Sequence, residues 1–372
     1  MKRSIAFAAI LLGFGLILAA CGAPSTTAAP TAVPTTAPTT APTLPPEPTT
    51  SPWTAPEGAL VSVLAPSAPT LDGVGDEGPW AEAPAATIAV RGGANNGSTD
   101  ITLRSVYTAD GVYFLVTWAD PTESYLRVPW EKQADGTWIK LVDPNGLLGE
   151  NNLYYEDKLA FIWPIDNSIP NFETQGCFTV CHAGENSDVK AFGNKYTAEE
   201  GQLGDIWHWK SIRNVSQADD QYLDSVRYSA DTPEAGRHGD PKDGGGYVNN
   251  ENEDKTLPAF MGPADMPRDG RPGFILDSEK LPFDDALFSA GDRIPGIIVA
   301  PFTGDRGDIS AGWQWADGVW TLEFGRLLVT GSDFDVQFED MAATYYFGVS
   351  AFDNAQVRHA FETGATPFVF QP

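Results

Sequence analysis

Two cysteines and the histidine that follows them are the residues whose spacing points most directly to chemistry. Cys177, Cys181 and His182 bound the segment Cys-Phe-Thr-Val-Cys-His. In a c-type haem attachment segment, Cys-x-x-Cys-His, two thiols form thioethers with the haem and the adjacent histidine binds the iron. Here one extra residue separates the cysteines and must bulge, but the Cys-His adjacency that sets the axial ligand is kept. The segment therefore predicts covalent haem with His182 as an iron ligand.

Spacing alone leaves a second interpretation open, a disulfide between Cys177 and Cys181. A disulfide is compatible with a chain outside the cytoplasm, and so short a loop is geometrically possible. A structural zinc site needs four ligands, and the chain has no second cysteine pair. A redox-active dithiol usually has two-residue spacing and a thioredoxin-like fold, which the sequence does not predict. Haem and disulfide thus remain as alternatives.

The third cysteine lies at the end of an N-terminal export signal. A basic start, the apolar run Ile5–Leu18 and small residues before Cys21 are typical of a secretory signal peptide. The run is too short for a membrane-spanning helix. Leu-Ala-Ala-Cys resembles the lipobox of bacterial lipoproteins, which implies an acylated Cys21 and an extracytoplasmic protein anchored to the bacterial cell membrane by lipid. The alternative is an ordinary secreted protein with a cysteine near its cleavage site.

Composition divides the rest of the chain into a spacer and a folded part. Residues 22–57 are almost entirely Pro, Thr, Ala and Ser, which cannot bury a core and favour extended conformations. The predicted organisation is a signal peptide at 1–20, a linker at 21–57 and one domain at 58–372. The formal charge of −27 disfavours nucleic acid and anionic lipid as partners. It could attract a basic redox partner, or it could serve solubility alone.

The domain that must position the cysteines is predicted to be mostly strands. Alternating or apolar segments that predict strands lie at 101–107, 112–118, 158–163, 294–300, 319–328 and 345–352. Asp110-Gly111 and Asp317-Gly318 are turn signals of the kind that join antiparallel strands. No long amphipathic helix is indicated, and residues 183–290 are rich in Gly, Asp, Asn and Pro. We expect an all-β fold, an antiparallel β-sandwich with a long irregular insertion that carries the haem-attachment motif.

Several ordered motifs give the chain a resemblance to a known family. They are Phe161–Asp166, Cys177–His182, Asp205–Lys210, Trp320–Arg326 and Phe347–Asn354. Together they resemble the haem-binding subunit family of ethylbenzene dehydrogenase, over most of 70–365. The resemblance implies a β-sandwich with one haem. In the better-known branch the haem is b-type with Met and Lys ligands, whereas this chain resembles a c-type branch. The usual ligand pair is therefore not transferable, and the sixth ligand is open.

The resemblance narrows the search for that sixth ligand. His359 falls where relatives place their lysine ligand, and would give bis-histidine ligation, which is typical of electron transfer. The alternative interpretation of His359 is an exposed loop residue. Met261 or Met266 could supply a thioether instead, or fill an apolar gap.

Further residues are expected around the haem without binding iron. His208 lies between two tryptophans in a motif that relatives keep without using it for iron, so it is expected to pack or hydrogen-bond near the haem edge. We expect Trp207 to lie beside the haem as well, although sandwich cores are rich in aromatic residues anyway. His238 lies in a polar segment that suggests no role.

The resemblance implies a monohaem c-type cytochrome that transfers electrons outside the cytoplasm and is not itself an enzyme. Its partner would be a molybdenum oxidoreductase or another respiratory carrier. An alternative is a carbohydrate- or ligand-binding sandwich, suggested by Thr70–Gly73 with Trp80 and by Asp110–Phe114. In that case Cys177 and Cys181 would form the disulfide. A third interpretation is a haem enzyme or gas sensor with an open sixth position.

Two acid-containing stretches raise the question of calcium. Asn249–Asp254 and Asp305–Asp308 could bind this ion, or they could be solvated loops, and neither follows the EF-hand spacing.

Overall fold

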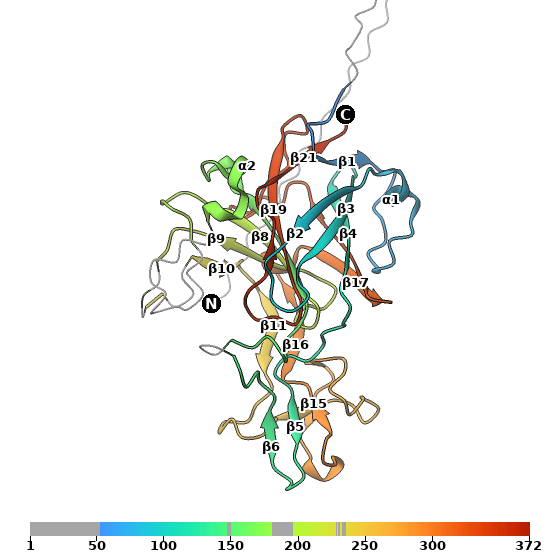
Figure 1. The fold of residues 1–372 in the computed structure, drawn as a ribbon, viewed down its shortest axis with the longest axis vertical. Coiled ribbons are helices and arrows are strands. Elements are labelled where there is room, and N and C mark those ends of the chain that lie inside the picture. Colours follow the sequence, from blue (N-terminus) through green and yellow to red (C-terminus); the bar gives the residue numbers. More distant parts are fainter. Residues whose placement is uncertain (1–52, 147–149, 181–195, 228, 230, 233–235) are drawn as a thin grey trace, which may run out of the picture. The chain divides into compact units, whose positions relative to one another are not determined.

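The computed structural model describes residues 53–372 except for 147–149, 181–195, 228, 230 and 233–235. Strands dominate this part of the chain, and its helices are short (Figure 1). The α-helices are α1 (Gly78–Glu82) and α2 (Phe172–Gln175), and the 3-10 helices are η2 (Ile165–Asn167), η3 (Gly176–Thr179), η4 (Asp285–Leu287) and η5 (Asp305–Gly307). The prediction of an all-β domain without long helices is confirmed for the described residues.

One large sheet folds over to supply both layers of a β-sandwich. Its strand order is β10-β9-β8-β7-β19-β21-β1-β3-β4-β18-β17, with β2 beside β3 and β20 beside β19. The bounds are β1 Leu60–Leu64, β2 Ala86–Val90, β3 Thr99–Tyr107, β4 Gly111–Ala119, β7 Lys158–Pro164, β8 Gly204–Lys210, β9 Asp219–Leu223, β10 Arg237–Gly239, β17 Ser310–Ala316, β18 Val319–Leu327, β19 Tyr345–Phe352, β20 Ala360–Phe361 and β21 Thr366–Phe370. The expected antiparallel pairing holds throughout this sheet except at β1, which runs parallel to both of its neighbours.

The predicted hairpins are present. β3 and β4 pair antiparallel from Ile101 opposite Trp118 to Tyr107 opposite Val112. β17 and β18 are joined by the two-residue turn Asp317-Gly318, and both of these residues have positive φ, 50° and 83°. Positive φ at both central residues is the requirement of the tight turn that matches strand twist, which Asp-Gly meets at little steric cost. The Asp317-Gly318 turn thus fixes the register in which β17 pairs with β18.

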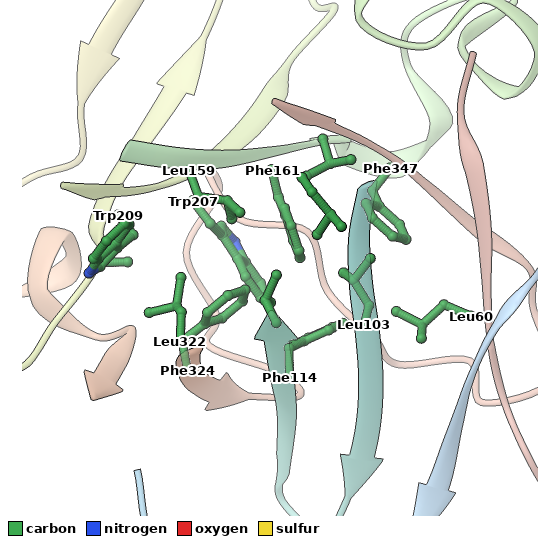
Figure 2. Packing of buried hydrophobic residues seen from close by; sticks show 14 of the residues in the cluster. Leu60, Leu103, Phe114, Leu159, Phe161, Trp207, Trp209, Leu322, Phe324 and Phe347 are labelled. Carbon is green, nitrogen blue, oxygen red and sulfur yellow. The ribbon is translucent and has the colours of Figure 1, made fainter. Parts of the chain in front are cut away.

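Aromatic and aliphatic side chains fill the space between the two layers. Phe161 and Trp207 come from one layer, and Phe114 and Phe324 come from the other (Figure 2). The ring centroid of Phe114 lies 5.9 Å from Phe161, 5.5 Å from Trp207 and 5.4 Å from Phe324. Burial of such side chains contributes about 1.5–3 kcal/mol each, so this cluster is the main stabilising feature of the sandwich.

The expected irregular insertion at 183–290 is only partly irregular. Residues 204–223 provide β8 and β9, two full strands of the main sheet. All seven residues of β8 are buried, because the core covers one face of the strand and other segments cover the opposite face. A strand buried on both faces lacks the in-out alternation that identifies strands in a sequence. This prediction was therefore wrong for β8 and β9.

β10 of the main sheet also comes from this insertion, whereas residues 244–282 build smaller sheets with residues 130–140 and 293–303. These are β11 (Gly244–Asn249), β16 (Ile297–Thr303) and β13 (Ile275–Leu276); β12 (Phe260–Met261) and β14 (Leu281–Pro282); and β15 (Arg293–Ile294), β5 (Trp130–Lys132) and β6 (Trp138–Lys140). A second hydrophobic cluster holds them together, centred on Trp130, Trp138 and Phe288. These sheets thus have a core of their own.

Candidate functional site

A pocket that is partly open to solvent lies against the outer face of β7, β8 and β19. The walls are mainly apolar, and the pocket brings together one cysteine, two histidines and one arginine. It is lined by Ala160, Phe161, Ile162, Cys177, Ile206, His208, Arg237, Gly348, Val349, Ser350, Phe352 and His359.

Strand alternation decides which side chains of β8 reach the pocket. Ile206 and His208 line it, whereas Trp207 and Trp209 belong to the core between the layers. Successive side chains of a strand point to opposite faces, so one strand serves the pocket and the core at once. The hydrogen bond from Trp207 Nε1 to Asp205 Oδ2, 2.9 Å, lies on the core side.

Glycines allow the cysteine segment to lie close to the sheet. Gly176 has φ 57° and ψ −141°, and a Cβ on it would lie 1.8 Å from the carbonyl oxygen of Gly364. Cys177 follows in η3, and a Cβ on Gly348 of β19 would lie 3.5 Å from the Cys177 nitrogen. Cys177 is buried and packs with Ile162, Phe172 and other apolar residues. The segment thus places the Cys177 thiol at the pocket wall.

Two of the three residues of the attachment motif cannot be placed. Cys181 and His182 lie outside the described residues, as does Cys21. Their predicted roles stay predictions. Among the residues just before them, Val180 is fully buried, and its N–H donates to the carbonyl of Cys177 over 3.1 Å.

His208 is held in a form suited to binding a ligand. Its Nδ1 lies 3.2 Å from Oε1 of Gln221 on β9, and its ring stacks on Phe352 with centroids 5.8 Å apart. An amide oxygen only accepts, so Nδ1 carries the proton and Nε2 keeps a lone pair. Nε2 is buried and has no hydrogen-bond partner among the described residues. An unpaired buried nitrogen at a pocket wall is available to a ligand atom or to a water molecule.

Burial and the surrounding positive charges keep the His208 imidazole neutral. Burial lowers the pKa of His208 well below its usual value, and the positive charges of Lys210, Lys158 and Arg237 lower it further. Neutral imidazole is the form that binds metals. Arg237 also lines the pocket, so the site offers a cation beside apolar walls. Such a combination suits a flat apolar ligand that carries carboxylates.

His359 enters the same pocket from the loop before β20. Its ring lies 5.1 Å from Phe352 and 6.0 Å from Phe361, measured between centroids, and it is half-buried. Its Nδ1 lies 3.3 Å from the carbonyl oxygen of Ala360. The sequence prediction thus named two residues, His208 and His359, that the structure brings to Cys177.

Other predicted site residues lie elsewhere. Trp207 does not line the pocket; its ring lies in the core, with the Arg326 guanidinium 4.7 Å from its centroid. The expected position of Trp207 beside the haem therefore finds no support in the fold. Met261 and Met266 pack against the second hydrophobic cluster, which shares no residue with the pocket lining. His238 stacks on Tyr222, with centroids 5.0 Å apart.

Sequence reasoning missed Arg237 and Gln221. Both lie in the segment that we expected to be irregular, and they join His208 only because β8, β9 and β10 are neighbours in the sheet. The residues that a side chain meets across a sheet leave no local signal in the sequence.

The sequence of the whole domain matches a known family. The profile described as "Ethylbenzene dehydrogenase" matches residues 77–363, which is well over half of the chain. The chain belongs to the ethylbenzene dehydrogenase family. The match covers all pocket residues, and it confirms the resemblance drawn from the ordered motifs. Among curated protein sequences, no significant match to this family member is found.

Solved structures similar to this family member include carbohydrate-binding proteins. A carbohydrate binding module family 9 from Caldicellulosiruptor kristjanssonii in complex with cellotriose matches with TM-score 0.31 and 8% identity, covering 84% of this chain and 94% of that one. A putative carbohydrate-binding protein from Bacteroides uniformis matches with TM-score 0.32 and 7% identity, covering 84% and 98%. Scores this low support no argument about function.

The residues that suggested a carbohydrate-binding module are structural in this family member. Trp80 is 1% exposed, and its Nε1 donates to Glu323 Oε1 over 2.7 Å. Gly73 N donates to Oε2 of the same carboxylate over 2.7 Å. Phe114 is fully buried in the core. These side chains cannot stack on a sugar from solvent.

Within the described ranges, no helix is long and apolar enough to cross a membrane.

Proposed function

We propose that this member of the ethylbenzene dehydrogenase family is a monohaem c-type cytochrome that transfers electrons outside the cytoplasm. The observation that carries the proposal is the pocket, where Cys177 lies with His208 and His359 against apolar walls. Haem, when bound, would supply the one-electron chemistry, and its potential would depend on axial ligands and on shielding from water.

The residues present fit such a group on three grounds. A buried cysteine from the predicted attachment motif lines the pocket. The Nε2 atom of His208 is buried with no partner in the described part of the chain, and the tautomer that leaves its lone pair available is fixed by Gln221. Arg237 supplies positive charge of the kind that pairs with the propionates of haem.

Each residue has a role under this proposal. Cys177 and Cys181 would hold the haem by thioether bonds, and His182 would bind the iron. Ile162, Ile206 and the other apolar wall residues exclude water. Opposite His182 the chain offers His359, in keeping with the sequence prediction, and His208 as a rival favoured by the lone pair on Nε2. Ligation of the iron by two histidines would suit electron transfer.

The protein is further proposed to be a lipoprotein anchored through Cys21, with an extracytoplasmic redox partner. A molybdenum oxidoreductase or another respiratory carrier is the partner class that the family suggests. The second candidate, a carbohydrate-binding protein, would have to use another surface. The open groove lined by Tyr125, Trp313 and Trp315 is the aromatic surface available for it.

One experiment separates the two functions. The mature chain is produced with a cytochrome c maturation system and examined by a haem-stained denaturing gel and a pyridine haemochrome spectrum. Covalent haem in the wild type and its loss in the double variant Cys177→Ala/Cys181→Ala are expected, with Cys21→Ser as the matched control that keeps haem. Absence of covalent haem from the wild type would contradict the proposal.

The same material identifies the ligand opposite His182. His359→Ala and His208→Ala are compared by the absorption spectrum of the ferric protein. Loss of the low-spin spectrum identifies the ligand, and the other variant is expected to stay low-spin. A low-spin spectrum in both variants would exclude both histidines as that ligand.

A further inference from the structure

Buried aspartates gather on the core side of β8 and β9, behind the strands that carry His208 and Gln221. Carboxylate oxygens of Asp205, Asp220 and Asp335 lie within 4.8 Å of one another. Oxygens of Asp305 and Asp308 approach Asp335 equally closely. These residues come from β8, β9, the turn around η5 and the loop after β18, so the fold brings together four distant segments.

One arginine faces this group of carboxylates. Arg326 Nη1 lies 3.0 Å from Asp205 Oδ2, 3.4 Å from Asp220 Oδ2 and 3.4 Å from Asp335 Oδ1. The nearby Arg306 is engaged elsewhere, since its Nε donates to Asp219 Oδ1 over 2.6 Å. A single guanidinium cannot balance so many buried carboxylates, and burying an unpaired charge is costly.

A neighbouring aspartate points independently to a missing partner. Asp240, just after β10, is 2% exposed, and neither of its carboxylate oxygens has a hydrogen-bond partner among the described residues. The Asp240 N–H donates to the carbonyl oxygen of Asp220 over 3.2 Å, next to the antiparallel pair of Gly239 and Gln221. Residues opposite each other in paired strands share a face of the sheet, so the Asp240 side chain lies on the same side as that of Asp220. Within the same described ranges, Oδ1 of Asp205 and Oδ1 of Asp308 are also buried without a hydrogen-bond partner.

We propose that Asp205, Asp240, Asp305, Asp308 and Asp335 form a calcium-binding site. The donors are carboxylate oxygens, the ligands that calcium prefers, without the nitrogen or sulfur typical of zinc or copper. Calcium accepts six to eight oxygens at about 2.3–2.6 Å, so oxygens on opposite sides of the ion lie about 5 Å apart. The oxygens meet that limit within each of two triads that share Asp335, namely Asp205 with Asp220 and Asp335, and Asp305 with Asp308 and Asp335. Magnesium is a weaker candidate because it keeps several waters, for which a buried site has little room.

A bound ion would also support the pocket. Asp205 and His208 lie on the same strand, and Asp220 precedes Gln221 on the next strand. An ion that ties β8 to η5 and to the loop after β18 would hold both strands in register behind the pocket. The calcium site does not depend on haem, since its ligands are on the opposite face of the sheet.

Calcium binding is tested on the full chain after dialysis against EGTA, by thermal unfolding and isothermal titration calorimetry. An ion present at about 100 times its Kd is expected to raise the Tm by roughly 5 °C, with a smaller shift from magnesium. Asp240→Asn should abolish the calcium shift. In EGTA this variant should unfold at the wild-type temperature or above it, because the neutral amide, unlike the buried acid, does not have to take up a proton when the chain folds.

Two comparison variants make the test specific. Asp254→Asn alters an exposed acid of the other predicted stretch and should keep the whole calcium shift. Asp120→Asn alters a second buried acidic group, made with Asp157 and Asp353, and should keep it too. The proposal is overturned if wild type unfolds at one temperature in EGTA and calcium, or if Asp240→Asn keeps the shift. Loss of the shift in Asp120→Asn alone would place the ion elsewhere and also overturn it.

Discussion

Replacing Gly176 by alanine tests how the cysteine segment is held against the sheet. Gly176 has φ 57° and ψ −141°, a conformation that belongs almost entirely to glycine and costs other residues about 1–3 kcal/mol. Its Cβ would lie 1.8 Å from the Gly364 carbonyl oxygen, whereas ordinary contacts begin at 3.4 Å. To relieve that overlap the backbone must move in a packed region, which costs about a further 1–3 kcal/mol of stability. We expect Gly176→Ala to lower the free energy of unfolding by about 2–6 kcal/mol.

Gly201→Ala is the matched control, because Gly201 also has positive φ, 84°, but a Cβ on it would have no heavy atom of another segment within 4 Å. Its cost should be limited to the left-handed conformation, about 1–2 kcal/mol. Urea unfolding measures both variants, and the haem content per chain measures the position of Cys177. Haem content should fall in Gly176→Ala only. Equal destabilisation of the two variants would refute the close contact with Gly364.

Three further predictions follow from charges and hydrogen bonds. In EGTA the free energy of unfolding should fall as the pH rises from about 4 to about 9. The reason is that folded Asp240, with its pKa raised to about 9, keeps a proton that the unfolded chain loses. Denaturant titrations of Asp240→Asn should show a weaker dependence of this free energy on pH. Glu323→Gln should lower the free energy of unfolding in urea by about 1–3 kcal/mol, because the amide group cannot accept from both Trp80 and the backbone. The control Asp100→Asn, in an exposed ion pair, should lower it by less than about 1 kcal/mol. Equal losses in the two variants would contradict this account. Cys21→Ser should move the protein from the membrane to the soluble fraction with its haem content unchanged, and retention at the membrane would exclude the lipid anchor.

Several features could be predicted because they depend on neighbouring residues in the chain. The β3–β4 hairpin and the Asp317-Gly318 turn follow from alternation and from the conformational freedom of Asp-Gly, and both are present. The family was identified from ordered motifs, and the sequence profile confirms it. The choice of His359 and His208 as residues near Cys177 also came from these motifs.

Other features depend on contacts across the sheet, which no local pattern records. β8 is buried on both faces, so its sequence lacked the alternation of exposure that would have marked it as a strand. The sequence also did not show on which face of β8 each side chain lies. Trp207 was expected beside the haem, but the alternation of side chains along the strand places it in the core and leaves His208 at the pocket. The sequence by itself determined the strand-rich class, the tight turns and the attachment motif, because each follows from covalent neighbours. Only the tertiary structure decided that Gln221 fixes the His208 tautomer and that Asp240 lies beside Asp220, because strand pairing brings these residues together.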